Sequence, residues 1–281
     1  MTPAEREAIG ALAGARVLDA SPLSGGCIGE VFRLDLADGR RLVAKTAGPG
    51  GTLDIEGYML AYLADKVPVP GVVHAAPDLL LMDFVETAGA LDAAAQQHAA
   101  DLLADLHGVT ADAFGHERDT LIGPLAQPNP WTASWIDFFR DQRLIHMGRL
   151  ALESGRLPAR TFGRLEQFCA KLDSYIGEPT RPSLIHGDMW GGNVLTRNGR
   201  IAAFIDPAIY HANPEIELAF ATLFGTFGDP FFHRYAEHRP IAPGFFESRR
   251  DIYNLYPLLV HTNLFGGHYA QSVDGILRRF T

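Results

Sequence analysis

The sequence predicts an α+β fold with two lobes, a small β-rich N-lobe and a larger, mainly helical C-lobe. The chain has 281 residues, a length at which one hydrophobic core tends to divide into two. Strand-like alternation of apolar and polar residues is concentrated before residue 86, and helix-like periodicity dominates after it. We therefore expect an N-lobe over residues 1–86 and a C-lobe over residues 87–281, with a hinge near residues 87–91.

Local patterns place the elements of the N-lobe. Residues 3–13 are expected to form a short helix. Residues 33–36 and 41–45 alternate polar and apolar side chains on either side of a glycine-containing turn, which is typical of a β-hairpin. Residues 53–64 carry apolar side chains on one side at helical spacing, and residues 79–85 are an apolar run of strand length.

Helices are expected to dominate the rest of the chain. Apolar residues recur at helical spacing in three segments, and three further helical stretches follow Pro214. A small β insert at residues 183–195 and 201–205 interrupts them. The three helical segments are residues 92–107, 131–152 and 157–176.

Composition limits the classes of function. Hydrophobic residues make up 47% and charged residues 20% of the chain, as in ordinary globular proteins. The net charge of −9 argues against a nucleic-acid partner, because proteins that bind phosphate backbones usually carry a basic face. The sequence has no 18-residue apolar run and its start lacks the features of a signal peptide. With only two cysteines, we expect a cytoplasmic protein with no membrane partner.

Polar residues in the β insert carry the most specific signal. Residues 186–193 read H-G-D-M-W-G-G-N, and I-D-P follows at residues 205–207. Phosphotransferases of the protein-kinase type need one carboxylate to accept a hydroxyl proton, and an amide and a second carboxylate to hold Mg²⁺ on ATP. We therefore predict Asp188 as the catalytic base, and Asn193 and Asp206 as the Mg²⁺ ligands. The alternative for each residue alone is a turn among glycines.

Three features of the N-lobe fit the binding of ATP. Residues 24–31 read S-G-G-C-I-G-E-V, close to the glycine-rich loop G-x-G-x-x-G-x-V of kinases. Lys45, at the end of the predicted hairpin, could neutralise the α- and β-phosphates, and Glu56 on the next helix is a natural partner for it. Each feature has an alternative explanation: the glycines could form only a tight turn, Lys45 could be a solvent-exposed lysine on an edge strand, and Glu56 could lie on the solvent-exposed face of its helix.

The expected nucleotide contacts in the loop are Gly25, Gly26, Cys27, Ile28 and Gly29. The backbone groups expected to meet adenine belong to Met82, Asp83, Phe84 and Val85.

These motifs resemble those of the fructosamine kinase (ketosamine-3-kinase) family, in the aminoglycoside phosphotransferase-like branch of the protein-kinase-like fold. The similar stretches are residues 25–28, 186–193 and the I-D-P-A-I-Y run at 205–210. The resemblance implies a bilobal kinase-like fold and transfer of the ATP γ-phosphate to the 3-hydroxyl of a ketosamine, the rearranged product of a sugar and an amine. Such phosphorylation serves deglycation. The resemblance also places Trp190 on the substrate side, and a core aromatic is the alternative.

Two other functions remain open. One is a small-molecule kinase for aminoglycosides, choline or homoserine, although residues 244–281 hold three acids against four arginines and polycationic antibiotics favour an acidic cleft. The other is a nucleotide-binding pseudokinase scaffold, which typically lacks the base, the metal ligands or the lysine. The preferred sugar and amine, and whether the substrate is free or protein-bound, stay open.

Overall fold

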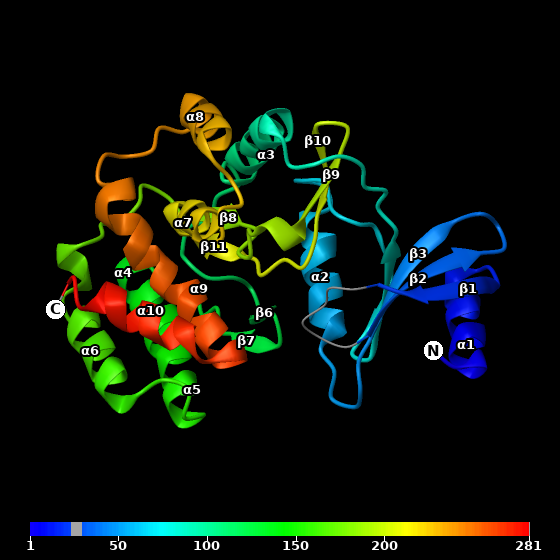
Figure 1. Cartoon of the computed structure of the whole chain (residues 1–281), viewed down its shortest axis with the longest axis horizontal. Helices are drawn as coiled ribbons and strands as arrows, with labels where there is room; N and C mark the ends of the chain where they lie inside the picture. Colours follow the sequence, from blue (N-terminus) through cyan, green and yellow to red (C-terminus); the bar gives the residue numbers. More distant parts are fainter. Residues whose placement is uncertain (24–29, 281) are drawn as a thin grey trace. The chain divides into compact units, whose positions relative to one another are not determined.

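The computed structural model describes residues 1–23 and 30–280, and this part of the chain divides into two compact units. Unit 1 comprises Met1–Leu102 and Gly192–Pro207, and unit 2 comprises Leu103–Gly191 and Ala208–Thr281. The longest strands belong to unit 1, and most helices belong to unit 2 (Figure 1). The lobe boundary at residue 86 stays a prediction. Outside the described residues lie the expected loop contacts Gly25, Gly26, Cys27, Ile28 and Gly29.

An antiparallel sheet with the strand order β1-β2-β3-β5-β4 forms the core of unit 1 in the described residues (Figure 1). The expected hairpin and the expected strand near residue 80 are confirmed by β2, β3 and β5. The two outermost strands were not expected, because an edge strand is half exposed and its sequence need not be continuously apolar. The bounds are β1 (Val17–Pro22), β2 (Glu30–Leu36), β3 (Arg41–Thr46), β4 (Val72–Ala76) and β5 (Leu79–Asp83).

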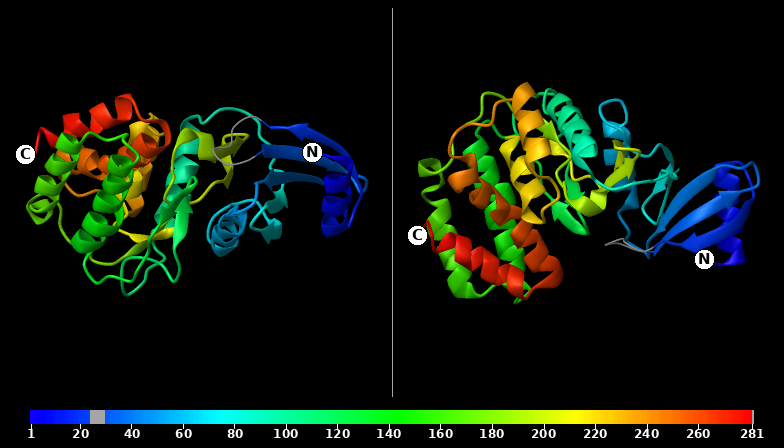
Figure 2. Two further views of the ribbon diagram at one scale, coloured as in Figure 1. Left: turned by 90° about the horizontal axis from the view of Figure 1, so that it is seen from below. Right: turned by 45° about the horizontal axis from the view of Figure 1, so that its top comes forward.

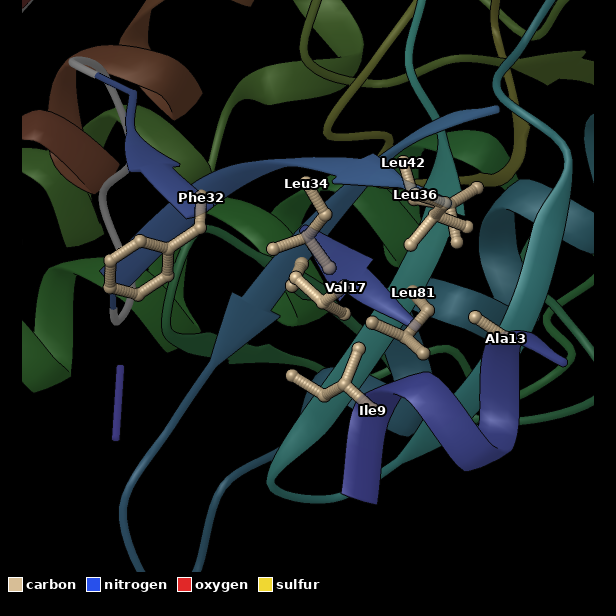
Figure 3. Close-up of a cluster of buried hydrophobic side chains, with 9 residues drawn as sticks. Ile9, Ala13, Val17, Phe32, Leu34, Leu36, Leu42 and Leu81 are labelled. Carbon is tan, nitrogen blue, oxygen red and sulfur yellow. The ribbon is translucent and has the colours of Figure 1, made fainter. Parts of the chain in front are cut away.

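Helix α1 (Pro3–Ala13) packs against one face of this sheet (Figure 3). Its first turn is fixed by a capping box, in which the Thr2 hydroxyl accepts from the Glu5 N–H and the Glu5 carboxylate accepts from the Thr2 N–H. Its side chains Ile9 and Ala13 join an apolar cluster with the strands. The strand members of that cluster are Val17, Phe32, Leu34, Leu36, Leu42, Ala44 and Leu81.

Helix α2 (Leu53–Leu63) covers the opposite face. Leu81 of β5 belongs to the cluster of α1, whereas its neighbour Leu80 packs with Leu53 and Leu60 of α2. Successive residues of a strand point to opposite faces of a sheet. The two helices therefore lie on opposite faces, and the expected helices at residues 3–13 and 53–64 are confirmed.

Unit 1 also contains the hairpin of β9 (Val194–Arg197) and β10 (Arg200–Phe204). Both residues of its tight turn, Asn198 and Gly199, have positive φ angles of 52° and 71°, as two-residue hairpin turns favour. The N–H of Phe204 donates to the carbonyl of Pro68 at 2.8 Å. This bond ties the hairpin to the rest of unit 1.

Unit 2 is mainly helical, and α9 contacts α5, α7 and α10 within it (Figure 2). The expected helix at 131–152 begins only at Trp135 and contains a π-helical stretch, and the helix expected to reach residue 176 ends at Cys169. Four α-helices, rather than three, follow Pro214 in the described residues. The helices are α3 (Ala93–Leu106, which begins in unit 1), α4 (Trp135–Phe138), α5 (His146–Glu153), α6 (Ala159–Cys169), α7 (Glu215–Leu223), α8 (Asp229–His238), α9 (Arg250–Phe265) and α10 (His268–Leu277).

Two short antiparallel pairs complete unit 2: β6 (Thr120–Ile122) with β7 (Leu125–Gln127), and β8 (Ser183–Ile185) with β11 (Tyr210–Ala212). The expected β insert is therefore divided between two sheets, because β8 pairs with β11 whereas β9 pairs with β10. Among the described residues, 1–23 and 30–280, no helix is both long and apolar enough to cross a membrane.

The packing of α2 on the sheet can be tested at Gly57. A Cβ at this position would lie 2.5 Å from the Cβ of Ala75 and 3.2 Å from a methyl carbon of Leu80. We expect Gly57→Ala to lower the free energy of unfolding by about 1–2 kcal/mol, because the overlap outweighs the gain in helix propensity. Urea denaturation measures the change.

The matched control for that substitution is Gly163→Ala in α6, where an added Cβ meets nothing within 4 Å. We expect it to be neutral or to stabilise the protein by up to about 1 kcal/mol. An equal gain for both variants would contradict the packing of α2 against β4.

Candidate active site

Lys45 of β3 is buried between two carboxylates of unit 1. Its neighbour Ala44 faces the cluster of α1, so the side chain of Lys45 points to the face covered by α2. Glu56 lies three residues after the buried Leu53 and therefore on the same side of α2. The Lys45 Nζ donates to Glu56 Oε1 at 2.6 Å and also to Asp206 Oδ1. The expected pairing of Lys45 with Glu56 is thus present.

Burial and charge oppose each other in this cluster. Lys45 is 7% and Glu56 is 8% exposed. Burial alone would lower the pKa of Lys45, but the charges of Glu56 and Asp206 outweigh it and raise that pKa above its ordinary value. Burial also raises the pKa of Glu56, and the ammonium group of Lys45 opposes this change. Lys45 is therefore a fixed cation at neutral pH, and it is neither at a sheet edge nor in solvent.

Asn193 and Asp206 lie next to each other at the open end of the β9–β10 hairpin. The last strand pair is Phe204 with Val194, and just beyond it the N–H of Ile205 donates to the carbonyl of Asn193 at 3.1 Å. Asp206 follows with a φ of 54°, in the left-handed region that few residues other than glycine adopt. Asn193 is buried, whereas the Asp206 side chain is 32% exposed.

The donor atoms of these two residues suit a magnesium ion bound together with phosphates. The amide oxygen of Asn193 and the carboxylate of Asp206 are hard ligands. No group of three or more His, Cys, Asp or Glu side chains in the described residues could hold a metal ion by itself. Mg²⁺ usually takes one or two protein ligands and completes its shell with phosphate oxygens and water. Asn193 and Asp206 thus stay our predicted Mg²⁺ ligands.

Asp188, the predicted base, lies in unit 2 on the loop that follows β8. The N–H of Ala208 donates to the carbonyl of His186 at 2.7 Å at the start of this loop. Gly187 has a φ of 87°, and a Cβ there would lie 2.1 Å from the carbonyl oxygen of Ala208. Only glycine fits this position. The tight turn at Gly187 is followed by Asp188, which is half-buried and lies two residues after the buried His186.

A fully buried network anchors the same loop to α7. Glu217 Oε1 accepts from the N–H of Gly187 at 2.7 Å, and its Oε2 accepts from His107 Nε2 at 2.8 Å. The other ring nitrogen of His107 lies 2.7 Å from the hydroxyl of Tyr235. A carboxylate can only accept, so Nε2 of His107 carries a proton. We call Glu217, His107 and Tyr235 the α7 network.

Burial would raise the pKa of Glu217, but the hydrogen bond and charge of His107, with the N–H of Gly187, outweigh it and lower that pKa. Sequence patterns did not assign the α7 network to the site. A usable signal was Glu217 inside the otherwise apolar run of residues 216–221, because a buried carboxylate needs partners.

In the strand expected to meet adenine, several backbone N–H groups already donate hydrogen bonds within unit 1. Met82 lies in β5, which is flanked by strands on both sides. The N–H of Asp83 donates to the carbonyl of Gly71 at 2.8 Å, and that of Phe84 donates to the carbonyl of Arg41 at 3.2 Å. Adenine contacts from this segment would therefore use carbonyl groups or the region of Val85, and they stay a prediction.

Trp190, the predicted substrate contact, is a surface residue of unit 2. Its backbone N–H donates to the carbonyl of Asp188 at 3.2 Å, and the residue is 38% exposed. Hydrogen bonds thus join Lys45, Glu56 and Asp206 within unit 1, where Asn193 pairs through its backbone with Ile205, the neighbour of Asp206. Asp188 and Trp190 lie two residues apart in unit 2.

The lowered pKa of Glu217 predicts a pH-dependent contribution to stability. A group whose pKa is lower in the folded state stabilises the fold above its unfolded pKa, and the gain is lost as pH falls through the folded pKa. We expect Glu217→Gln to cost about 1–3 kcal/mol at neutral pH, and the difference from the wild type to shrink in acid. Thermal melts of both proteins from about pH 7 to about pH 3 measure it.

The control for this experiment is Glu237→Gln in α8, which removes an exposed ion pair with Arg234. Exposed pairs contribute little, so its melting temperature should follow the wild type at every pH. A Glu217→Gln difference that stays constant through the acid range would contradict an ionised, buried Glu217.

Sequence comparisons match this chain to one family. The model of the fructosamine kinase family matches residues 4–281. A Synechocystis protein named as a probable ketoamine kinase is 39% identical over 180 residues, which span 63% of this chain and 59% of that protein, less than two thirds of its length. A Vibrio vulnificus protein, also named as a probable ketoamine kinase, is 33% identical over 270 residues, 91% of each chain.

Solved structures show the same fold. A candidate fructosamine-3-kinase from Thermobifida fusca matches with a TM-score of 0.90 and 30% identity, over 99% of this chain and 98% of that one. The aminoglycoside phosphotransferase APH(4)-Ia matches with a TM-score of 0.66 at 20% identity over 98% of each chain, a likeness that concerns the fold alone. The predicted two-lobed, protein-kinase-like α+β fold is confirmed, and so is the resemblance seen in the motifs. The chain belongs to the fructosamine kinase family.

Proposed function

We propose that this protein is an ATP-dependent kinase that phosphorylates the 3-hydroxyl group of ketosamines and thereby serves deglycation. The observation that carries the proposal is the buried ammonium group of Lys45, paired with Glu56 and Asp206. Membership of the fructosamine kinase family and the ketoamine kinase names of its relatives support the substrate class. Its expected compartment is the cytoplasm, which suits a chain with two cysteines.

The Lys45 cluster favours a phosphate-binding role over a structural one. Removing charged groups from water costs several kcal/mol for each ion, and well-packed apolar residues often give equal or greater stability. A cluster with no function would therefore lower the stability of the fold relative to apolar side chains at the same positions. A fixed cation beside a partly exposed carboxylate is, in contrast, what a nucleoside triphosphate and its metal ion require.

In the mechanism that we propose, unit 1 binds ATP. The backbone of the loop at residues 24–29 and the ammonium group of Lys45 hold the phosphates, and Glu56 keeps Lys45 in place. Asn193 and Asp206 would hold Mg²⁺, which would neutralise charge on the phosphate oxygens. Positioning and charge neutralisation supply most of the rate.

The chemical step is a direct transfer. Asp188 accepts the proton of the 3-hydroxyl group while that oxygen forms a bond to the γ-phosphorus of ATP. The bond from the γ-phosphorus to the bridging β–γ oxygen breaks, and ADP leaves with that electron pair. The α7 network and the strict fit of Gly187 hold the Asp188 loop in one conformation. The product is a ketosamine 3-phosphate, whose lability releases the amine.

The first test of this function is Asp188→Asn. The amide keeps the size of the side chain but cannot accept the proton, so we expect kcat with a ribulose-derived ketosamine to fall by about 10²–10⁴-fold. The dissociation constant for ATP, measured by calorimetry, should stay within about twofold of the wild type, because the nucleotide contacts are elsewhere. Asp173→Asn, an exposed aspartate of unit 2, is the control. Near-normal turnover of Asp188→Asn would refute the assigned base.

A second test separates the catalytic role of Lys45 from its structural one. Lys45→Met leaves the buried Glu56 without its partner, so we expect a loss of about 3–5 kcal/mol in unfolding free energy. Adding Glu56→Gln should restore part of that stability, since the uncompensated charge is removed. Neither variant should recover kcat/KM for ATP. Recovery of activity together with stability in the double variant would show that Lys45 is only structural.

A further inference from the structure

A continuous line of aromatic rings begins at the loop of Asp188 and extends across unit 2. The ring centroid of Trp190 lies 6.3 Å from that of Phe224, and Phe224 lies 5.0 Å from His261. From His261 the contacts continue to Phe265 at 5.7 Å and to Tyr269 at 5.0 Å. We call Trp190, Phe224, His261, Phe265 and Tyr269 the aromatic strip.

The elements of unit 2 hold these rings in fixed places. Phe224 is the C-cap residue directly after α7. His261 and Phe265 are four residues apart on α9 and therefore share one of its faces. Tyr269 belongs to the first turn of α10, and its ring also lies 6.0 Å from that of Phe265. The strip is thus assembled from three helices and the loop after β8.

Three of the five rings of the strip are exposed, although such side chains are of the kind that fill a core. Trp190 is 38%, Phe224 41% and Phe265 59% exposed. Each exposed ring forgoes a burial gain of about 25 cal/mol per Å² of apolar surface. Single exposed apolar residues are ordinary, but contiguous ones mark binding surfaces.

The strip has no fixed charge of its own. None of its five residues carries a carboxylate, a guanidinium or an ammonium group. Nδ1 of His261 donates to the carbonyl of Pro257 at 2.7 Å. Burial lowers the pKa of His261 below its ordinary value, so the ring is neutral near pH 7 and acts as an aromatic surface.

The geometry points to the aromatic strip as the subsite for the amine-derived part of the substrate, and to aromatic or apolar groups as its ligands. This inference rests on the proposed function. A ketosamine carries its nitrogen substituent on the carbon two places from the one that bears the 3-hydroxyl. A substrate whose 3-hydroxyl meets Asp188 therefore places that substituent only a few bonds away.

The position of Trp190 links the strip to this chemistry. The backbone N–H of Trp190 donates a hydrogen bond to the carbonyl of Asp188. The first residue of the strip therefore lies in the same turn as the proposed base. A sugar is small and polar, so it needs only the region of Asp188 and Trp190. The rings from Phe224 to Tyr269 lie further along and are left for the substituent on nitrogen.

The experiment compares two ketosamines that share the ribulose sugar, one made from benzylamine and one from ethanolamine. We expect the KM of the full-length wild type to be about tenfold lower for the benzylamine adduct than for the ethanolamine adduct. The reason is that packing an aromatic ring against other rings strengthens binding by about tenfold. Phe224→Ala and Phe265→Ala should each raise that KM about 5- to 20-fold. The KM for the ethanolamine adduct and kcat for both should change less than about twofold.

Phe246→Ala is the matched control. Phe246 is 43% exposed and contacts two other rings, Phe232 and Phe245, but it lies outside the strip. Its substitution should leave both KM values unchanged, and thermal melts should show that all three variants remain folded. Equal KM values for the two adducts in the wild type, or equal effects of Phe224→Ala on both, would overturn the inference while the kinase function stood. Failure of the wild type to phosphorylate either adduct would instead refute the proposed function.

Discussion

The pairing of one buried ammonium group with two carboxylates is the interaction on which unit 1 depends. Lys45 comes from the sheet, Glu56 from α2, and Asp206 from the segment after β10. A single side chain therefore joins two consecutive elements to a segment 161 residues further along the chain. Each charge would be costly to bury alone. The Asp206 side chain is 32% exposed whereas that of Lys45 is 9% exposed, so Asp206 is the member of this ion pair that a further cation can reach from solvent. That geometry agrees with the metal-ligand role proposed for Asp206 and Asn193.

The same structural device recurs in unit 2, with a histidine as the partner of the glutamate. Glu217 lies on the apolar helix α7, as Glu56 lies on α2, and it accepts hydrogen bonds both from a side chain and from the backbone of the Asp188 loop. In both units a buried glutamate on a helix accepts a hydrogen bond from a strand or from the loop after one, namely from Lys45 of β3 in unit 1 and from the N–H of Gly187 after β8 in unit 2. Rigid placement matters because phosphoryl transfer relies on positioning, and small displacements of the reacting groups are costly. The aromatic strip fits this picture, since three of its rings, His261, Phe265 and Tyr269, belong to helices.

Sequence reasoning succeeded where the signal was local. The hairpin of β2 and β3, the helices α1 and α2, and the pairing of Lys45 with Glu56 follow from alternation, helical periods and motif spacing. The edge strands β1 and β4 were missed because their exposed faces break the apolar pattern. His107 and Tyr235 could not be found, since the partners of His107, Glu217 and Tyr235, both lie more than one hundred residues away from it in the chain. The π-helical stretch within residues 131–152 was hidden because its apolar period resembles that of an ordinary helix.

The backbone at Asp206 adds an argument for function that does not depend on motif likeness. The residue before a proline normally adopts an extended conformation with negative φ, yet Asp206 precedes Pro207 with a φ of 54°. Such a conformation costs about 1–3 kcal/mol and persists only where surrounding contacts enforce it. The ion pair with Lys45 and the bond between Ile205 and Asn193 supply those contacts. Strain held in this way places a carboxylate oxygen beside Lys45 and leaves the side chain partly open, as a ligand for a phosphate-bound cation requires.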